Sequence, residues 1–500
     1  MKKFLALVLL SLNPYLMAAT PSTIAVGELE LEFCHISGYR QEVLCGDFRV
    51  YEDRVGQQGR QIDINFAVVP AVAIDKEDDP LVFFAGGPGQ GSLDVGAFVN
   101  VAFNELHENR DIVLIDQRGM GSSHPLDCES DEDVSFLLSD EERASIGREN
   151  LQQCLLELDA DVTKYTQDIA NEDIHDILLA LGYDRVNLYG GSWGTRSALL
   201  YNHQFPEHVR SVILDGTAPL ENKVPLYANA DAERALQALF QDCTNDANCQ
   251  AAFPNLEQDF NLVLDSLGES GIEVTLNDST SGEETTFLLT RSTFVNAIRV
   301  ILYTPQISRL IPTIIEQGKN GDFRAMSAIM DALEGDAGIT VGAQMTILCA
   351  EDYPRMSGQE IAAEAGNGFV ADAFVEVFLN GCSVWPQAPL PEIYSQDLSS
   401  EVPTLILSGE IDPVTPPRWG NRTAEVMTNS LHLVAPNTGH NVAPVGCAPD
   451  LMAQFVNEGT VDNIDGSCLN EVSRPSFFIN ASGPIPAAND SNNSPETDND

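Results

Sequence analysis

The segment RVNLYGGSWGTRSALLY, residues 185–201, places one serine among glycines where an apolar run meets a helical pattern. A serine hydroxyl becomes a useful nucleophile when a sharp turn exposes it and a base removes its proton. Such a turn brings strand and helix so close that side chains two residues before and after the serine would collide. Gly190 and Gly194 occupy those positions, so we interpret Ser192 as a candidate nucleophile for acyl transfer.

A serine nucleophile also needs a base and an acid that orients the base, and both types occur later in the chain. Asp412 follows an apolar run in VPTLILSGEIDPVTPP, and His440 follows the next such run in LHLVAPNTGHNV. Taken alone, Asp412 fits equally well a residue that caps a turn before Pro413. The other histidine beyond Asp412, His432, lies inside an apolar pattern. The order Ser192, Asp412, His440 is that of α/β-hydrolases.

Donors for a developing oxyanion are expected in the segment FFAGGPGQGS, which follows an apolar run ending at Phe84. Glycines allow backbone N–H groups to approach a substrate closely. We assign the oxyanion site to the backbone amides of Gly87 and Trp193, with Gly86 as an alternative. An ordinary tight turn is the simpler interpretation of these glycines.

The elements that must position these residues are predicted by seven apolar, β-branched runs that end in turn-forming residues. These runs are Gln61–Val69, Leu81–Phe84, Asp111–Ile115, Val186–Tyr189, Val209–Leu214, Val402–Leu407 and Ser430–Val434. Helical patterns lie between some of them, most clearly in NEDIHDILLALGYDRV. Continuous apolar strands that alternate with amphipathic helices predict an α/β fold with a mostly parallel central sheet covered on both faces.

The alternation stops in the middle of the chain, where helical patterns such as DAERALQALFQDC and RSTFVNAIRVILY dominate. We therefore predict that residues 20–219 and 396–480 form the α/β core and that residues 220–395 form a helical cap inserted before the last strands. Residues 481–500 are rich in Pro, Asn, Ser and Asp, which predicts a disordered acidic tail.

The first 19 residues, MKKFLALVLLSLNPYLMAA, combine two lysines, a short apolar run and small residues before a cleavage point. This layout predicts a secretory signal peptide, with a buried N-terminal helix as the alternative. No later segment of the sequence is long and apolar enough to span a membrane. We therefore expect a secreted or periplasmic protein.

Ten cysteines agree with export, because an oxidising compartment allows thiols to pair. We predict five local disulfides, Cys34–Cys45, Cys128–Cys154, Cys243–Cys249, Cys349–Cys382 and Cys447–Cys468. Buried free thiols are the alternative, and no Cys-x-x-Cys or Cys/His cluster predicts a metal site.

The composition, with 43% apolar and 20% charged residues, is that of a globular protein with a sizeable core. The formal charge is −49, and removal of the signal segment, which carries two lysines and no acid, makes it −51. Such a surface repels nucleic acid and anionic lipid, so we expect neither as a partner.

At these residues the chain resembles the proline iminopeptidase and tripeptidyl aminopeptidase family of α/β-hydrolases. The similar segments are GGPGQGS, DIVLIDQRGMGSS, LYGGSWGTRSALLY, ILDGTAP, VPTLILSGEIDPVTPPRWG and PNTGHNV with the CA that follows it. The last of these, with Cys468 as partner, resembles the C-terminal segment of the tripeptidyl branch. Proline iminopeptidases usually have His before Gly-Gly-Pro-Gly, where this chain has Ala85, and this difference also favours the tripeptidyl branch.

The resemblance implies that Ser192 is the nucleophile, His440 the general base and acid, and Asp412 its orienting partner, beneath a mostly helical cap. It also implies that DQRG, residues 116–119, is a family marker, which we interpret as bracing a loop.

We therefore predict an exported serine exopeptidase that releases tripeptides or shorter N-terminal pieces from peptides through an acyl-enzyme, without cofactor or metal. Binding of the substrate ammonium calls for a carboxylate under the cap, for which Glu351, Asp352 and Glu410 are candidates by their position in the chain. A solvated surface role is the alternative for each. A secreted carboxylesterase or lipase-like hydrolase on the same scaffold is the alternative function. A third interpretation is a non-catalytic binding protein, which would normally have lost one of the three candidate catalytic residues.

Overall fold

The structure is a computed structural model that describes most of the 500-residue chain. The described residues are 23–128, 137–277, 282–333, 338–480 and 482–484. The predicted signal peptide and nearly all of the predicted acidic tail lie outside them.

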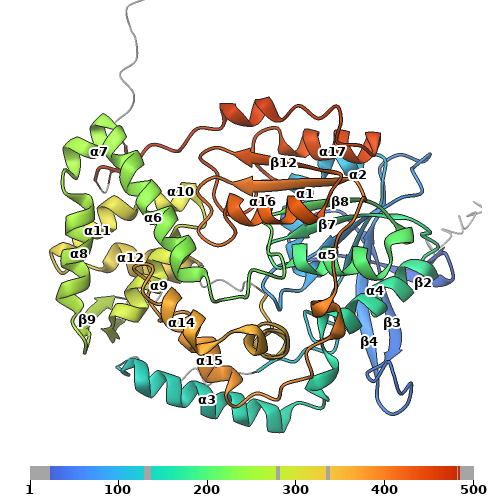
Figure 1. The fold of residues 1–500 in the computed structure, drawn as a ribbon, viewed down its shortest axis with the longest axis horizontal. Helices are drawn as coiled ribbons and strands as arrows, with labels where there is room; N and C mark the ends of the chain where they lie inside the picture. Colours follow the sequence, from blue (N-terminus) through green and yellow to red (C-terminus); the bar gives the residue numbers. More distant parts are fainter. Residues whose placement is uncertain (1–22, 129–136, 278–281, 334–337, 481, 485–500) are drawn as a thin grey trace, which may run out of the picture.

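A ten-stranded sheet forms the centre of the α/β core, in the order β1-β2-β3-β4-β6-β5-β7-β8-β11-β12 (Figure 1). The strands are β1 Thr23–Val26, β2 Leu29–Cys34, β3 Val43–Tyr51, β4 Gln61–Val69, β5 Leu81–Phe84, β6 Ile112–Ile115, β7 Val186–Gly191, β8 Val209–Asp215, β11 Thr404–Gly409 and β12 Ser430–Ala435. Strands β1 to β4 pair antiparallel, and β4 pairs antiparallel with β6. All pairings from β6 to β12 are parallel, as predicted.

Two hydrophobic clusters cover the two faces of this sheet because its central strands are apolar on both sides. In β4, Ile64 and Phe66 belong to one cluster and Ala67 and Val69 to the other, as the two-residue period of a strand requires. The first cluster includes residues of α4 and α5, and the second includes residues of α1, α2 and α17. The helices are α1 Gly96–Ala102, α2 Asn104–His107, α4 Gln167–Ala180, α5 Gly194–Gln204, α16 Pro417–Val426 and α17 Ala448–Glu458.

The chain between β8 and β11 forms a second layer with a hydrophobic core of its own. Its helices are α6 Ala228–Asn245, α7 Ala247–Ala252, α8 Leu256–Leu267, α9 Arg291–Ile301, α10 Pro305–Ser308, α11 Ile311–Lys319, α12 Arg324–Leu333, α13 Val341–Ile347, α14 Gly358–Glu364 and α15 Val375–Cys382. A hairpin of β9 Ile272–Asn277 and β10 Glu284–Leu289, which the sequence analysis did not predict, interrupts them. Figure 1 shows this layer beside the sheet, in yellow-green to orange.

One further helix, α3 (Asp140–Glu157), lies against this layer although it comes from the segment between β6 and β7. The Arg148 guanidinium donates a hydrogen bond of 3.0 Å to Asn380 Oδ1 on α15, and Arg143 donates to Thr293 Oγ1 on α9. We propose that the cap consists of residues 220–395 together with α3.

All five predicted disulfides are present, and the described residues contain no free cysteine. Among the described residues no helix is both long and apolar enough to cross a membrane. The disulfides agree with an extracellular or cell-envelope location, because such bonds persist in oxidising compartments.

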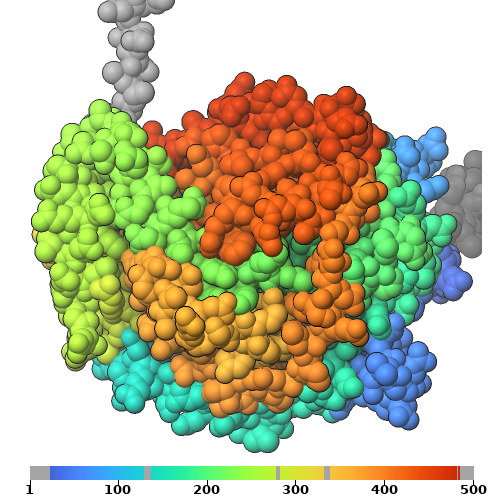
Figure 2. Space-filling model, in the orientation of Figure 1, coloured from blue at the N-terminus to red at the C-terminus, as the bar shows by residue number. Residues whose placement is uncertain are grey.

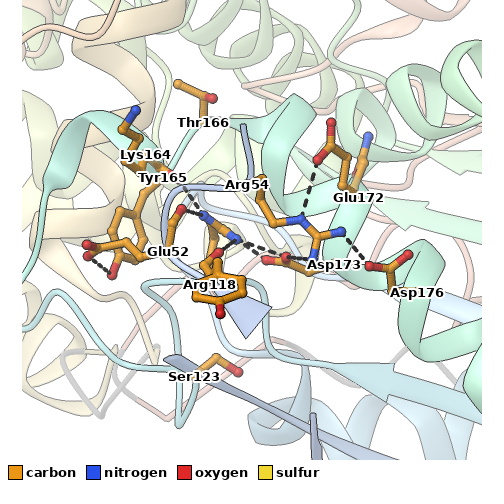
Figure 3. A network of polar contacts seen from close by, with 12 residues as sticks. Glu52, Arg54, Arg118, Ser123, Lys164, Tyr165, Thr166, Glu172, Asp173 and Asp176 are labelled. Carbon is orange, nitrogen blue, oxygen red and sulfur yellow. Dashed lines mark hydrogen bonds and ion pairs between the residues drawn. The ribbon is translucent and has the colours of Figure 1, made fainter. Parts of the chain in front are cut away.

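The DQRG segment braces the loops beside the sheet, as the sequence analysis predicted (Figure 3). The buried Arg118 guanidinium donates two hydrogen bonds, of 2.6 and 2.9 Å, to the Asp173 carboxylate on α4. It also donates to the carbonyl oxygens of Glu52 and Lys164. Asp116 accepts hydrogen bonds from two backbone N–H groups, and burial raises its pKa to about 6.

Candidate active site

The turn between β7 and α5 carries Ser192 in a left-handed conformation, with φ of +55°. A Cβ on Gly190 would lie 2.4 Å from the carbonyl oxygen of Gly194, and a Cβ on Gly194 would lie 2.0 Å from the carbonyl oxygen of Phe84. Real Cβ atoms do not approach backbone that closely, so any larger residue at either position would push strand and helix apart. The two glycines therefore permit the strained, close-packed turn that exposes a serine.

Asp412 and His440 form a hydrogen-bonded pair in the loops after β11 and β12. His440 Nδ1 lies 2.8 Å from Asp412 Oδ2. Asp412 is fully buried, and its Oδ1 accepts hydrogen bonds from the backbone N–H groups of Val414 and Thr415. The Thr415 hydroxyl donates to Asp412 Oδ2 over 2.8 Å. These contacts fix the carboxylate so that it faces the imidazole.

Asp215, at the end of β8, connects the histidine loop to the nucleophile turn. Its carbonyl oxygen accepts the Ser192 N–H over 2.8 Å and the Asn441 side-chain amide over 3.1 Å. Its carboxylate accepts the two backbone N–H groups that follow Asn441. Ser192 and the residue next to His440 are thus held by the same peptide group.

The Ser192 hydroxyl lies in a space bounded by glycine backbone. A Cβ on Gly86 would lie 3.7 Å from Ser192 Oγ, and a Cβ on Gly216 would lie 3.3 Å from His440 Cε1. Ser192 Oγ makes no hydrogen bond to any residue that the structure describes. Hydrogen bonds between nucleophile and base are often long until substrate binds.

The cap also contacts the histidine and the Asp412 loop. The backbone N–H of His440 donates to the Tyr303 carbonyl oxygen over 2.8 Å. The side-chain rings of the two residues meet edge to face, with centroids 5.3 Å apart. The Arg234 guanidinium on α6 donates to the backbone carbonyl oxygens of Glu410 and Asp412. In Figure 2 the surface of the cap adjoins that of the β11–β12 region of the core.

The glycine-rich loop after β5, for which the sequence analysis predicts an oxyanion site, lies beside the nucleophile turn. Gly87 and Gly89 both have φ of +106°, a conformation that favours glycine. Neither the Gly87 N–H nor the Trp193 N–H has an acceptor among the described residues. The Gln344 side chain on α13 donates to the Pro88 carbonyl oxygen over 3.2 Å and braces this loop.

A cavity of about 630 Å³ lies between α3, α9, α13 and α15. Gln344 lines it and is also the residue that contacts the glycine-rich loop. Apolar side chains such as Leu151, Met345 and Phe378 form much of its wall. Its volume lies within the range of small-ligand sites.

The three candidate carboxylates for ammonium binding are not brought together. Glu351 and Asp352 are both fully buried in a π-helical turn, Leu348–Asp352, of the cap. Glu351 accepts hydrogen bonds from the first backbone N–H of α4 and from the Tyr394 hydroxyl, and burial raises its pKa to about 7. Glu410 is exposed beyond β11, where it accepts a hydrogen bond from a backbone N–H of the loop after β12.

Asp352 binds guanidinium groups. Arg196 donates to both of its oxygens over 2.9 and 2.8 Å, and Arg355 donates a further bond. These contacts favour a structural role for Glu351 and Asp352 over direct binding of the substrate ammonium.

Among the residues at the site that were not singled out from the sequence are Thr415, Tyr303 and Arg196. Thr415 carried a usable signal, since a Thr three positions after an Asp commonly closes a local turn. The other two had none, because their roles depend on contacts between distant parts of the chain.

The pKa of His440 is set by opposing effects. Burial disfavours the imidazolium, but the Asp412 carboxylate and its hydrogen bond outweigh this and raise the pKa above the ordinary 6.5. For Asp412, burial acts in the opposite direction, yet the pKa is lowered by the neighbouring His440. The pair is therefore suited to hold a positive charge on the imidazole.

Because the imidazole must be neutral to accept a proton, we expect kcat/KM to fall on the acid side with a midpoint above 6.5. The pH profile of kcat/KM measures this, since it reports the free enzyme. His432, whose pKa burial lowers, is the matched control, and His432→Gln should leave the midpoint unchanged. A midpoint at or below 6.5 would contradict the assigned environment of His440.

The comparisons with known proteins agree with this architecture. Residues 79–252 match the alpha/beta hydrolase fold family, and residues 367–468 match the TAP-like protein family. The chain therefore has the α/β-hydrolase fold.

Its relatives include peptidases. The chain is 25% identical to serine protease Hip1 of Mycobacterium tuberculosis over 85% of its own length and 87% of that protein. It is 27% identical to tripeptidyl aminopeptidase of Streptomyces lividans over 40% of each chain. It is 30% identical to proline iminopeptidase of Neisseria gonorrhoeae over 27% of its length and 32% of that protein. These relatives support peptidase activity.

Proposed function

We propose that the protein is an exported serine exopeptidase that removes tripeptides or shorter pieces from free N-termini. The observation that carries the proposal is the Asp412–His440 hydrogen bond of 2.8 Å, held through Asp215 beside the strained turn of Ser192. The named activities of its relatives support the choice of peptides over other acyl compounds.

In the proposed mechanism Ser192 Oγ attacks the scissile carbonyl carbon while His440 Nε2 accepts the hydroxyl proton. Asp412 holds the Nδ1–H and stabilises the imidazolium. The N–H groups of Gly87 and Trp193 donate to the oxyanion, and the positive end of the α5 dipole adds to this stabilisation. His440 then gives the proton to the leaving amine, and water releases the acyl group from Ser192.

The cap supports action on short peptides. Its contacts with His440 and the Asp412 backbone support a route in which substrate reaches the site beneath it. The cavity beside the glycine-rich loop has room for part of a short peptide. We propose that residues on the N-terminal side of the scissile bond occupy this cavity.

Acetylation of the substrate N-terminus tests the exopeptidase assignment. We expect a good tripeptidyl anilide to lose about 30- to 5,000-fold in kcat/KM when its amine is acetylated. The carboxylate that the proposal requires for the ammonium would then be left unpaired, which costs roughly 2–5 kcal/mol. Release of the anilide chromophore measures this. Equal turnover of the blocked substrate would indicate an endopeptidase or esterase, and faster turnover of p-nitrophenyl esters than of all peptide anilides would favour the carboxylesterase alternative.

A further inference from the structure

Arg196, one turn into α5, is fully buried directly behind the nucleophile turn. Its guanidinium carbon lies 4.0 Å from the centroid of the Trp193 ring. Trp193 is itself only 2% exposed, and its backbone N–H is one of the two proposed oxyanion donors. The guanidinium is therefore stacked on the residue whose amide must be placed accurately.

All three nitrogens of the Arg196 guanidinium donate hydrogen bonds. Two bonds go to Asp352, and the other three go to the carbonyl oxygens of Ala218, Pro219 and Asn222, which follow β8. A planar guanidinium that is bound through all three of its nitrogens is held in one orientation. Arg196 thus fixes the Trp193 ring from behind.

The acid partner belongs to the cap rather than to the core. Asp352 ends the π-helical turn Leu348–Asp352, and Arg355 pairs with the same carboxylate. The disulfide Cys349–Cys382 attaches this turn to α15. π-Helical turns are often found at functional sites. One buried ion pair, with both side chains 0% exposed, therefore joins the cap to the nucleophile helix.

Stability alone is a weak reason for such a pair, because well-packed apolar residues of similar volume often replace a buried ion pair without loss. Accurate placement is a stronger reason. A misplacement of about 1 Å at a reacting centre can cost roughly 100-fold in rate. The Trp193 amide has no acceptor among the described residues, so packing and the helix backbone alone hold it in place.

We propose that the Arg196–Asp352 pair is a positioning device that holds the Trp193 amide in the oxyanion site, so that assembly of this site depends on the seated cap. This inference rests on the proposed function for the identity of the nucleophile. Arg196 and Asp352 touch neither the substrate nor the reacting atoms, and they act through Trp193.

The test compares two double variants that each replace a buried Arg–Asp pair by apolar residues. Arg196→Met with Asp352→Leu removes the proposed device. Arg118→Met with Asp173→Leu is the matched control, because that pair is also buried and joined by two hydrogen bonds, with side chains 0% and 2% exposed. It braces loops around Tyr165 instead of Trp193. The single variant Arg196→Lys keeps the charge but loses the planar fork.

The readouts are the rate constant for phosphonylation of Ser192 by a fluorophosphonate, kcat and KM for a p-nitrophenyl ester, and Tm. We expect the Arg196/Asp352 variant and Arg196→Lys to lose about 10- to 100-fold in phosphonylation rate and kcat, with KM changed less than about threefold. The control variant should have a lower Tm than the wild type, but its folded fraction should be phosphonylated at the wild-type rate. The ester and the phosphonate do not require peptide specificity, so these measurements remain valid if the exopeptidase assignment fails.

Two results would overturn the inference. One is a folded Arg196/Asp352 variant with a phosphonylation rate within twofold of the wild type. The other is an equal loss of rate in the Arg118/Asp173 control, which would indicate a general structural effect. A wild-type protein that is not labelled at Ser192 would instead refute the proposed nucleophile.

Discussion

Replacement of Ser192 by alanine is expected to lower kcat for peptide anilides by about 10⁴- to 10⁶-fold, the range observed when a triad nucleophile is removed. The physical reason is that no acyl-enzyme forms without the hydroxyl, whereas binding and the proposed oxyanion donors remain. Alanine is tolerated sterically because only the hydroxyl is removed from a turn whose close contacts involve glycine backbone. Release of chromophore by purified protein measures the loss.

A matched serine control is available on the surface. Ser395 is exposed, and its hydroxyl donates only to the backbone carbonyl oxygen of Glu392. Ser395→Ala should keep full activity. If Ser192→Ala retained more than a few per cent of wild-type kcat after contamination had been excluded, the proposed nucleophile would be wrong.

The second large effect is expected from Asp412→Asn, which should reduce kcat by about 10⁴-fold near neutral pH. Asp412 Oδ1 accepts two backbone N–H groups. An asparagine will therefore place its oxygen there and turn its amide NH2 towards His440 Nδ1. The imidazole must then accept at Nδ1 and carry its proton on Nε2, so it cannot accept the Ser192 proton.

The measurement is kcat against pH for wild type and Asp412→Asn, with circular dichroism to verify folding. Asp397→Asn is the control, since Asp397 is exposed and binds only the nearby Ser399. A folded Asp412→Asn variant within tenfold of the wild type would show that this carboxylate does not select the imidazole tautomer.

The parallel half of the sheet was predictable because most of its strands are buried on both faces and therefore largely apolar. The seven predicted runs correspond to β4, β5, β6, β7, β8, β11 and β12. Strands β1 and β2 are largely exposed, as in LELEFC of β2, and lack such runs. The β9–β10 hairpin is similar, with mostly half-buried residues. Exposed strands are specified by their neighbours more than by their own residues.

The candidate site was predictable to the extent that local sequence encodes it. The glycines around Ser192 and the loops of Asp412 and His440 follow strands, and strand ends meet at one edge of a parallel sheet. The pairing of Arg196 with Asp352 spans 156 positions in the chain. No local pattern identifies such a pair. The sequence analysis therefore had only the position of Asp352 in the chain, and on that basis it named Asp352 as a candidate for ammonium binding.

The central claim is that Ser192 is a nucleophile activated by the Asp412–His440 pair, and mapping the site of a covalent adduct tests it most directly. Protein treated with a fluorophosphonate is digested, and the modified peptide is identified by mass spectrometry. The account predicts one adduct, on Ser192, formed in step with loss of activity and absent when His440 is replaced by alanine. An active enzyme that forms no adduct, or one inactivated by modification at another residue, would contradict it.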